Sequence, residues 1–447
     1  MSETTERWGS RRAFILAVTG AAVGLGNIWR FPYMTGENGG SAFLLLYIGF
    51  VLLLGLPVMM AEIMIGRAGR RGPMQALAHL AVSGGRTPHW RWLGLFGAIT
   101  MFFILSFYSV VSGWSIEYLV DSLKGDFSGM SPPEIGASFG AFLEDPVTMT
   151  FNHTVFMLMT MSVVAAGISS GLERLNNLMM PLLYVLLLAL AGYSISTPGF
   201  GPALSWLFMP NPSAITLDVM LNAMGHAFFT LAVGACALMA YGAYMPERQS
   251  LPTAAIAVAA LDIGVALLAG IAIFAAVFSQ GMDPASGPGL MFVSLPIAFA
   301  NLPGGSVLLA LFFLLLLLAT WTSSINIAEP IVEVLEGWGL KRRHAALVVG
   351  VSVWAMGLLS VLSFSSLKDV HVLGEMNVFD AVTTIPPDFF LPIGGLLIAI
   401  FAAWVMPQNR ALAGLGTSRG FFRTWRWVLR WISIPLVVVV LGWSFFK

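Results

Sequence analysis

Long apolar runs recur along the whole chain, separated by short segments rich in glycine, proline or charge. A helix that crosses the hydrocarbon core of a bilayer, about 30 Å thick, needs about 20 mostly apolar residues. Continuous runs of this length predict membrane-spanning α-helices rather than the short alternating strands of a membrane β-barrel. Eleven such runs are present, at Phe14–Tyr33, Ala42–Ile65, Leu93–Leu119, Thr154–Ser170, Leu178–Ile195, Leu217–Tyr241, Ala254–Phe278, Val307–Leu335, Ala345–Leu362, Phe389–Met406 and Val428–Phe446.

The composition also indicates an integral membrane protein. Hydrophobic residues make up 57% of the 447 residues and charged residues only 10%, whereas soluble domains carry about 25% charged residues. We therefore exclude a water-soluble enzyme and a disordered chain. The net charge of zero gives no support for nucleic-acid binding. Cys236 is the single cysteine, so an internal disulfide and a cysteine-based zinc site are excluded as well.

Lys and Arg residues are unevenly divided between alternate loops. If the N-terminus lies inside the cell, all but four of the 22 Lys and Arg residues fall on or near the cytoplasmic side. The exceptions are Arg30, Lys124, Lys368 and Lys447. The positive-inside rule therefore predicts a cytoplasmic N-terminus and, after eleven spans, an external C-terminus.

The first apolar run contains features that break a helix. Gly20, Gly24 and Gly26 fall within seven residues and are followed by Asn27. Each glycine in a helix interior costs about 1 kcal/mol relative to alanine, and unwound backbone in a membrane is tolerated only where it lines a cavity. A small-residue packing face would explain the glycines, but it would not explain Asn27 and Arg30.

The sixth run also carries glycine and polar groups at mid-depth, at Gly225, His226, Thr230 and Gly234. Runs one and six occupy matching positions if the chain consists of two five-helix repeats. Interrupted helices in matching positions of two halves indicate a transporter binding site. Half-helix N-termini can hold a carboxylate there, and freed carbonyls can hold a cation.

The eighth run supplies a cluster of polar side chains, at Thr320, Thr322, Ser323, Ser324 and Asn326. A single hydroxyl in a membrane helix usually bonds back to the carbonyl four residues earlier. A cluster of hydroxyl and carbonyl oxygens suits a hard cation, which here would be sodium.

These residues resemble the neurotransmitter:sodium symporter family, and its bacterial amino-acid transporters in particular. The resemblance extends from residue 8 to about residue 406. It rests on Trp8-Gly9-Ser10-Arg11, Ala22–Tyr33, Glu37-Asn38-Gly39-Gly40, Phe228-Phe229-Thr230-Leu231, Thr322-Ser323-Ser324 and Leu391-Pro392-Ile393-Gly394-Gly395. The rule on interrupted helices was drawn partly from this same fold, so it is not independent support.

The resemblance implies an all-α, leucine-transporter-like fold, a 5+5 inverted repeat with helices 1 and 6 broken. The whole chain, 1–447, would be one transmembrane domain in the cell inner membrane, crossing it many times. Residues 12–196 would form the first repeat, residues 217–406 the second, and residues 427–446 an additional eleventh helix.

The resemblance further implies two sodium sites and a substrate site between them. The first sodium site would comprise Ala22, Asn27, Thr230 and Asp262, and the second Gly20, Val23, Ala319, Thr322 and Ser323. The substrate would contact Ala21, Ala22, Leu25, Gly26, Ile104, Tyr108, Phe229, Thr230, Ala232, Ala235, Ser323 and Ile327. Small residues at 232 and 235 favour a bulky apolar amino acid.

Asp262 stands inside an apolar run, where a carboxylate costs about 2.5 to 3.5 kcal/mol. A cation partner would offset that cost. Some relatives hold chloride beside the first sodium, and a carboxylate there resembles a built-in substitute. The equivalent of that anion site would be Tyr47, His226, Thr230 and Asp262. No chloride requirement is expected, and His226 is either a neutral hydrogen-bond donor or a group that titrates.

Two gates are implied, one at each side of the substrate site. Thr383 occupies the position of the acid that relatives pair with the Arg30 position. Arg30 is therefore expected either to pair with Asp380, nearly one turn away, or to close the gate through water. On the cytoplasmic side Trp8 is present. Thr5 and Gly337 replace the usual arginine and acid, and their neighbours Arg7 and Glu336 are the expected substitutes.

The sequence therefore predicts sodium-coupled symport of an amino acid, with neither enzyme activity nor a nucleic-acid partner. An alternative is a proton-coupled transporter on the same fold, with Asp262 or His226 as the proton site. A channel and a membrane-embedded enzyme are further alternatives, although no nucleophile with its base and no H-E-x-x-H cluster is present. The amino acid, the sodium stoichiometry and the oligomeric state stay open.

Overall fold

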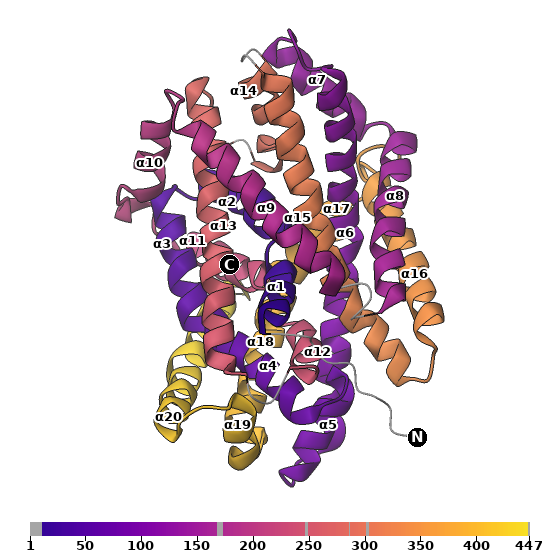
Figure 1. The fold of residues 1–447 in the computed structure, drawn as a ribbon, viewed down its shortest axis with the longest axis vertical. Coiled ribbons are helices and arrows are strands. Elements are labelled where there is room, and N and C mark those ends of the chain that lie inside the picture. The colour runs from indigo at the N-terminus through magenta and orange to yellow at the C-terminus, as the bar shows by residue number, and fades with distance from the viewer. Residues whose placement is uncertain (1–10, 168–172, 246–248, 286, 301–303, 446–447) are drawn as a thin grey trace.

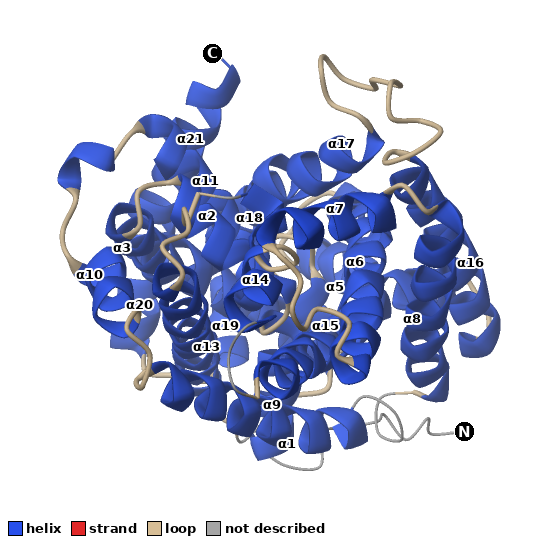
Figure 2. Ribbon diagram, turned by 90° about the horizontal axis from the view of Figure 1, so that it is seen from above, coloured by secondary structure: helices blue, strands red, loops and turns tan. Residues whose placement is uncertain are grey.

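The computed structural model describes residues 11–167, 173–245, 249–285, 287–300 and 304–445. Every regular element in these residues is a helix, apart from an isolated bridge between Leu373 and Met376 (Figures 1 and 2). The prediction of an all-α fold is confirmed.

The helices follow one another with few long connections. In chain order the α-helices are α1 (Arg11–Ala22), α2 (Phe31–Glu37), α3 (Ser41–Phe50), α4 (Leu56–Gly69), α5 (Pro73–Ser83), α6 (Arg91–Lys124), α7 (Pro132–Leu143), α8 (Pro146–Ala166), α9 (Glu173–Ser194), α10 (Phe200–Phe208), α11 (Leu217–Thr230), α12 (Ala237–Ala243), α13 (Leu251–Ser279), α14 (Ser294–Ala300), α15 (Gly305–Gly337), α16 (Arg342–Leu362), α17 (Val378–Ile385), α18 (Leu391–Ile400), α19 (Gln408–Leu415), α20 (Arg419–Val428) and α21 (Ile434–Phe445). Single π-helical turns join several of them, namely η1 (Gly26–Arg30), η2 (Val51–Gly55), η7 (Pro386–Phe390), η8 (Phe401–Val405) and η9 (Leu429–Ser433).

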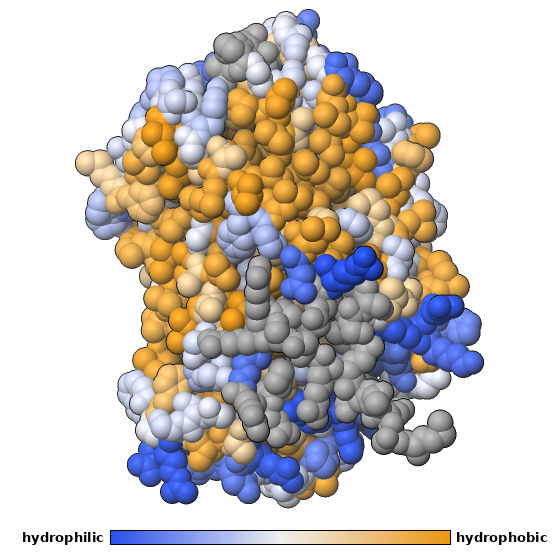
Figure 3. All heavy atoms as spheres, in the orientation of Figure 1, coloured by the Kyte–Doolittle hydropathy of each residue, from blue (hydrophilic) through white to orange (hydrophobic). Residues whose placement is uncertain are grey.

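Most of the expected spans are present as long apolar helices. In the described residues, nine helices are long and apolar enough to cross a membrane, and a tenth span consists of two helices bent by 44° at the first break. The expected sixth span, Leu217–Tyr241, is divided into α11 and α12, neither of which reaches the length of a span alone. Hydrophobic residues cover much of the face shown in Figure 3, and hydrophilic residues gather toward its upper and lower ends.

One expected boundary is wrong by several turns. The tenth span was expected at Phe389–Met406, but the helix runs from Val378 to Val405. Polar residues and two prolines lower the hydropathy of its first half. The helix continues through them because η7 accommodates Pro386 and Pro387 as a π-helical turn.

The two expected helix breaks are confirmed. The first helix ends at Ala22, and the chain resumes as a helix at Gly26. In the second break, between α11 and α12, Ala232, Gly234 and Cys236 all have positive φ angles, of 52°, 98° and 60°. Only glycine adopts such angles without strain, so the surrounding structure must hold the two other residues in place.

The broken segments lie at the centre of the bundle. α15 packs along α6, and α1 packs against α9, α13 and α15. A β-carbon at Gly24 would lie only 2.2 Å from the Tyr108 hydroxyl oxygen and 2.8 Å from Ser323 Oγ. A residue without a side chain is therefore required where the first break approaches α6 and α15.

Candidate functional site

A small central cavity lies between the two broken helices, α6, α15 and α18. Its volume is about 20 Å³, counted as the space open to the centre of a water molecule. That is enough for a water and too little for an amino-acid side chain unless the lining residues move. The lining residues are Ala21, Ala22, Gly26, Met101, Ile104, Tyr108, Phe229, Ala232, Ser323, Ile327 and Leu391.

Most of the expected substrate residues line this cavity, but Leu25, Thr230 and Ala235 do not. Leu25 contributes its backbone, because its N–H donates to the Tyr108 hydroxyl at 3.0 Å. Thr230 is turned toward Asp262 instead. The backbone of Ala235 packs against Gly97 of α6. A β-carbon added at Gly97 would lie only 2.3 Å from the Ala235 carbonyl oxygen.

The sequence interpretation missed two lining residues, Met101 and Leu391. Met101 stands three residues before Ile104 and so shares its helix face, a signal that was available in the sequence. Leu391 comes from α18, and no local pattern connects that helix with the cavity.

Asp262 is the centre of a buried polar cluster. Its carboxylate accepts hydrogen bonds from Asn27 Nδ2 at 2.7 Å, from Thr230 Oγ1 at 2.9 and 3.1 Å, and from the Tyr47 hydroxyl at 3.0 Å. All four side chains are fully buried. The structure thus brings three of the four residues expected at the first sodium site into direct contact, and these donors satisfy the carboxylate.

The Asn27 side chain also stabilises the broken backbone. Its Nδ2 donates to the Asp262 carbonyl oxygen at 3.0 Å, and its Oδ1 accepts from Gly24 N at 3.2 Å. The amide therefore connects the first break to α13 on one side and to its own unwound turn on the other.

His226 takes no part in this hydrogen-bonded cluster. Its ring lies among the rings of Phe31, Phe43 and Tyr47, with centroids 5.9, 5.6 and 5.0 Å away. The side chain is fully buried, and neither ring nitrogen has a hydrogen-bond partner among the described residues. The expectation that His226 shares an anion site with Tyr47 and Asp262 is met only by its contact with the Tyr47 ring.

The residues expected at the second sodium site lie where α1 packs against α15. Thr322 Oγ1 lies 3.0 Å from the carbonyl oxygens of Leu318 and Ala319, so its proton is used within its own helix. Ser323 Oγ donates across to the Ala21 carbonyl at 3.2 Å. Both hydroxyl oxygens keep lone pairs that can face a cation.

Two further residues expected at the second sodium site, Gly20 and Val23, are closely packed. A β-carbon at Gly20 would lie 2.2 Å from Asn176 Oδ1, so α9 approaches α1 closely here. Val23 is fully buried, and its N–H donates to the Thr19 carbonyl at 2.7 Å.

The expected pairing of Arg30 with Asp380 is wrong. Arg30 Nη2 instead lies 2.6 Å from Asp388 Oδ1, and the guanidinium also lies over the Phe229 ring, 5.1 Å from its centroid. Asp380 is exposed and forms a capping box with Asn377 at the start of α17. Asp388 lies about two helical turns further along the chain, where η7 directs it toward α11. A β-carbon at Gly225 would be 2.4 Å from Asp388 Oδ1.

A second, partly buried ion pair joins the C-terminal part of α15 to the start of α16. Arg342 contacts Glu329 at 2.6 Å and Glu336 at 3.4 Å. Glu336 was expected to act at the cytoplasmic gate, whereas Glu329, almost completely buried in α15, was missed. Thr5, Arg7 and Trp8, the other residues considered for this gate, lie outside the described residues.

Glu62 is a further buried acid that the sequence interpretation missed. Its carboxylate accepts from Gly234 N at 2.5 Å, within the second break, and from Leu238 N at 3.2 Å, in the first turn of α12. An acid within an apolar run was the signal that drew attention to Asp262, and the same signal was present at Glu62.

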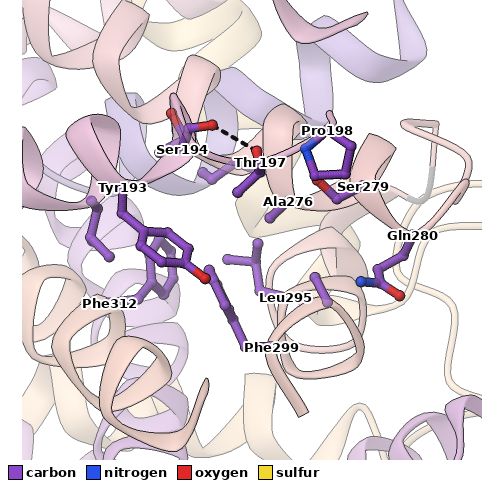
Figure 4. Close-up of a pocket in the computed structure, with 14 residues that line it drawn as sticks. Tyr193, Ser194, Thr197, Pro198, Ala276, Ser279, Gln280, Leu295, Phe299 and Phe312 are labelled. Atoms are coloured by element: carbon purple, nitrogen blue, oxygen red, sulfur yellow. Dashed lines mark hydrogen bonds between the residues drawn. The ribbon is translucent and has the colours of Figure 1, made fainter. Parts of the chain in front are cut away.

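A second cavity, of about 90 Å³, lies between α9, α13, α14 and α15, away from the broken helices (Figure 4). Its lining is mostly apolar, with Leu295, Phe299 and Phe312 facing the Tyr193 ring. The Thr197 hydroxyl donates to the Ser194 carbonyl at 2.7 Å. None of the residues that were expected to bind sodium or substrate lines this second cavity.

Comparisons with known proteins agree with this geometry. The family model described as the sodium:neurotransmitter symporter family matches residues 5–131 and 137–446. An uncharacterized sodium-dependent transporter, YhdH of Bacillus subtilis, is 36% identical over 97% of this chain and 96% of its own length. The human sodium- and chloride-dependent GABA transporter 2 is 24% identical over 94% of this chain and 77% of its own length. The crystal structure of MhsT in complex with L-phenylalanine superposes with a TM-score of 0.92 at 41% identity, covering 98% of this chain and 99% of that one.

Proposed function

This chain belongs to the sodium:neurotransmitter symporter family, and from that premise we propose that it carries a neutral, hydrophobic amino acid without any need for chloride. Sodium-coupled amino-acid symport is its activity. The observation that carries the proposal is the Asp262 carboxylate, enclosed by Asn27, Thr230 and Tyr47 beside the first helix break.

Charge balance is the reason for chloride independence. A sodium ion held by the Ala22 carbonyl, Asn27 and Thr230 needs a negative counter-charge in a medium of low dielectric constant. In this chain Asp262 supplies it within the protein, so no chloride is required. The relative whose name includes chloride dependence is the more distant human transporter.

The lining of the central cavity supports a hydrophobic substrate. Met101, Ile104, Ile327 and Leu391 are apolar, and Ala232 leaves room beside Phe229. The 41%-identical structure, MhsT, contains L-phenylalanine. Each buried methylene contributes about 0.8 kcal/mol, so affinity will rise with the apolar area of the substrate side chain.

The polar end of the substrate meets the unwound backbone. We assign its carboxylate to the first sodium, the Tyr108 hydroxyl and the backbone at Leu25 and Gly26. Its ammonium group faces carbonyls of the two broken helices, which carry partial negative charge. The second sodium is assigned to Gly20, Val23, Ala319, Thr322 and Ser323.

The transport cycle needs two gates, and we assign them to two ion pairs. Arg30 with Asp388, beside the Phe229 ring, would close one side of the substrate site. Arg342 with Glu329 and Glu336 would close the other side. Rocking of one repeat against the other would open them alternately.

The proposed topology counts α11 and α12 as one broken span, which gives eleven spans. The N-terminus is then cytoplasmic and the C-terminus external. Residues 12–196 and 217–406 form the two inverted repeats, and residues 427–446 form the last helix. The protein resides in the cell inner membrane.

Radiolabelled phenylalanine uptake into proteoliposomes tests the proposal. Replacing external sodium by choline is expected to abolish uptake, and replacing chloride by gluconate is expected to leave it unchanged. Unlabelled leucine, tryptophan and phenylalanine should compete, and glutamate and lysine should not. Competition by none of the twenty amino acids would refute the substrate class.

The proton-coupled alternative predicts a different result in the same experiment. Uptake that continues without sodium and follows an imposed pH gradient would place the coupling proton on Asp262 or His226. The unpartnered nitrogens of His226 are the observation that keeps this alternative open.

A further inference from the structure

Two arginines near the end of the chain converge on a single carbonyl oxygen. Arg426, in α20, and Arg430, in η9, lie one helical turn apart. The Nε and Nη2 atoms of Arg426 donate to the Ala403 carbonyl at 3.0 and 2.7 Å. The Nε of Arg430 donates to the same oxygen at 3.2 Å, and its Nη2 also contacts it. Ala403 belongs to η8, the last turn of the tenth span.

A carbonyl oxygen has two lone pairs, so one guanidinium would satisfy it. A cation near the C-terminal end of a helix is stabilised by the helix dipole, which again explains one arginine and not both. Like charges four residues apart on a helix destabilise it. The second arginine therefore requires another explanation.

No carboxylate balances this pair. Neither Arg426 nor Arg430 forms an ion pair in the part of the chain that the structure describes, where the ion pairs involve Arg30, Lys124 and Arg342. No Asp or Glu occurs anywhere after Asp388 in the sequence. The Nη1 atoms of both arginines make no hydrogen bond to described residues, so donors are left for an external acceptor.

Tryptophans surround the pair at the surface. The Arg430 guanidinium lies over the Trp404 ring, 4.9 Å from its centroid. Trp427 and Trp431 are 56% and 65% exposed. Tryptophan collects at the interface between headgroups and hydrocarbon. In Figures 1 and 3, α19 and α20 lie at the lower end of the molecule, where hydrophilic residues border the hydrophobic surface.

We propose that Arg426 and Arg430 form a binding site for the phosphate of an anionic phospholipid. Arginine donors match phosphate oxygens in a two-pronged geometry, and one phosphate can bridge both guanidinium groups. The exposed Trp404 and Trp431 rings lie against the glycerol region and the upper acyl chain. An anionic lipid is favoured over a zwitterionic one because basic groups at a membrane surface attract net negative charge, at about 1 kcal/mol each.

The site is independent of the transport proposal, and native mass spectrometry of the purified full-length protein tests it. Dioleoyl-phosphatidylglycerol is titrated, with dioleoyl-phosphatidylcholine as the comparison lipid. The double variant Arg426→Gln/Arg430→Gln is expected to bind phosphatidylglycerol about tenfold more weakly than the parent, because it loses charge-assisted hydrogen bonds to the phosphate. Phosphatidylcholine should bind weakly to both proteins.

The matched control is Arg419→Gln/Arg423→Gln, which removes the same charge from two exposed positions of α20. It is expected to retain the parent's affinity. The single variant Arg430→Lys keeps the charge but loses the planar fork, and an intermediate affinity is expected. This variant preserves a readout if the double variant fails to fold.

Three results would overturn the proposal. The first is binding of phosphatidylglycerol by the Arg426 and Arg430 double variant as tight as that of the parent. The second is an equal loss of affinity in the control, which would indicate general charge attraction only. The third is complete displacement of the lipid by equimolar inorganic phosphate, which would indicate a site for a free anion rather than for a lipid.

Discussion

At the scale of single residues, two buried carboxylates occupy the positions for which we propose functional roles. Asp262 accepts hydrogen bonds from three uncharged donors, and Asp388 pairs with Arg30. A carboxylate without such partners is costly inside a membrane. The kind of partner therefore distinguishes their tasks: uncharged donors leave Asp262 a net charge for a cation, whereas the Arg30 pair is already neutral.

The role of the Arg30–Asp388 ion pair can be tested by comparing Asp388 with Asp380, the partner that the sequence suggested. Asp388→Asn leaves Arg30 buried without a counter-charge. We expect amino-acid uptake to fall by at least about tenfold, because a buried ion pair is lost. Asp380→Asn is the matched control, because that side chain is exposed and only caps α17. Equal effects of the two variants on uptake would show that the ion pair seen here is not the gate.

The counter-charge of Asp262 can be exchanged for a free ion. Asp262→Ser removes the carboxylate while keeping a hydroxyl that can bond Asn27, and we expect uptake to become dependent on external chloride. Uptake is measured in chloride and in gluconate, with the parent protein as control. Chloride-independent uptake by the variant at the parent's rate would contradict the proposed role.

At the scale of helices, each break is stabilised by contacts with neighbouring helices. In the second break three residues with positive φ angles lie within five positions. Glu62 of α4 accepts hydrogen bonds from Gly234 N, within the break, and from Leu238 N, in the first turn of α12. Two backbone donors that the break leaves unpaired within their own helix are thereby satisfied from a neighbouring one.

Removing that support should loosen the break. Glu62→Ala leaves both N–H groups buried without an acceptor, at about 1 to 3 kcal/mol each. We expect a lower thermal unfolding temperature and weaker substrate binding. Glu62→Gln keeps one acceptor oxygen and should lose less. Scintillation-proximity binding and thermal unfolding of both variants check this, and unchanged binding by Glu62→Ala would argue against the role.

The arrangement of the whole molecule brings segments far apart in the sequence to one cavity. α1, α6, α11, α15 and α18 each contribute residues to its lining. Hydrophobic side chains cover much of the face of the molecule shown in Figure 3. The two ion pairs that we propose as gates are those of Arg30 and Arg342.

The proposed orientation of the molecule can be tested with single cysteines. Cys236 is buried and is the only cysteine, so Cys236→Ser provides a background without thiols. Glu144→Cys, after α7, is expected to react with an impermeant maleimide in intact cells. Gln408→Cys, at the start of α19, should react only after permeabilisation. The reverse pattern would invert the topology.

The sequence by itself determined the class of protein, most of the spans and both helix breaks, and it pointed to Asp262 as an acid within an apolar run. These features depend on hydropathy over one span, or on glycine and polar residues within one or two turns. Such local properties can be read from the amino-acid sequence alone. The start of the tenth span escaped detection because a π-helical turn carried the helix through prolines that usually end one.

Only the tertiary structure decided which side chains meet. Arg30 pairs with Asp388 rather than Asp380, Arg342 holds Glu329 as well as Glu336, and Leu391 joins the cavity from a distant helix. Asp380 and Asp388 are separated by about two helical turns, and only Asp380 was expected from the sequence. The choice between them depends on how α11 packs against η7, where Gly225 leaves room for the carboxylate. Packing between segments so far apart in the chain has no local signature, and for that reason the ion pairs had to be seen in the folded molecule.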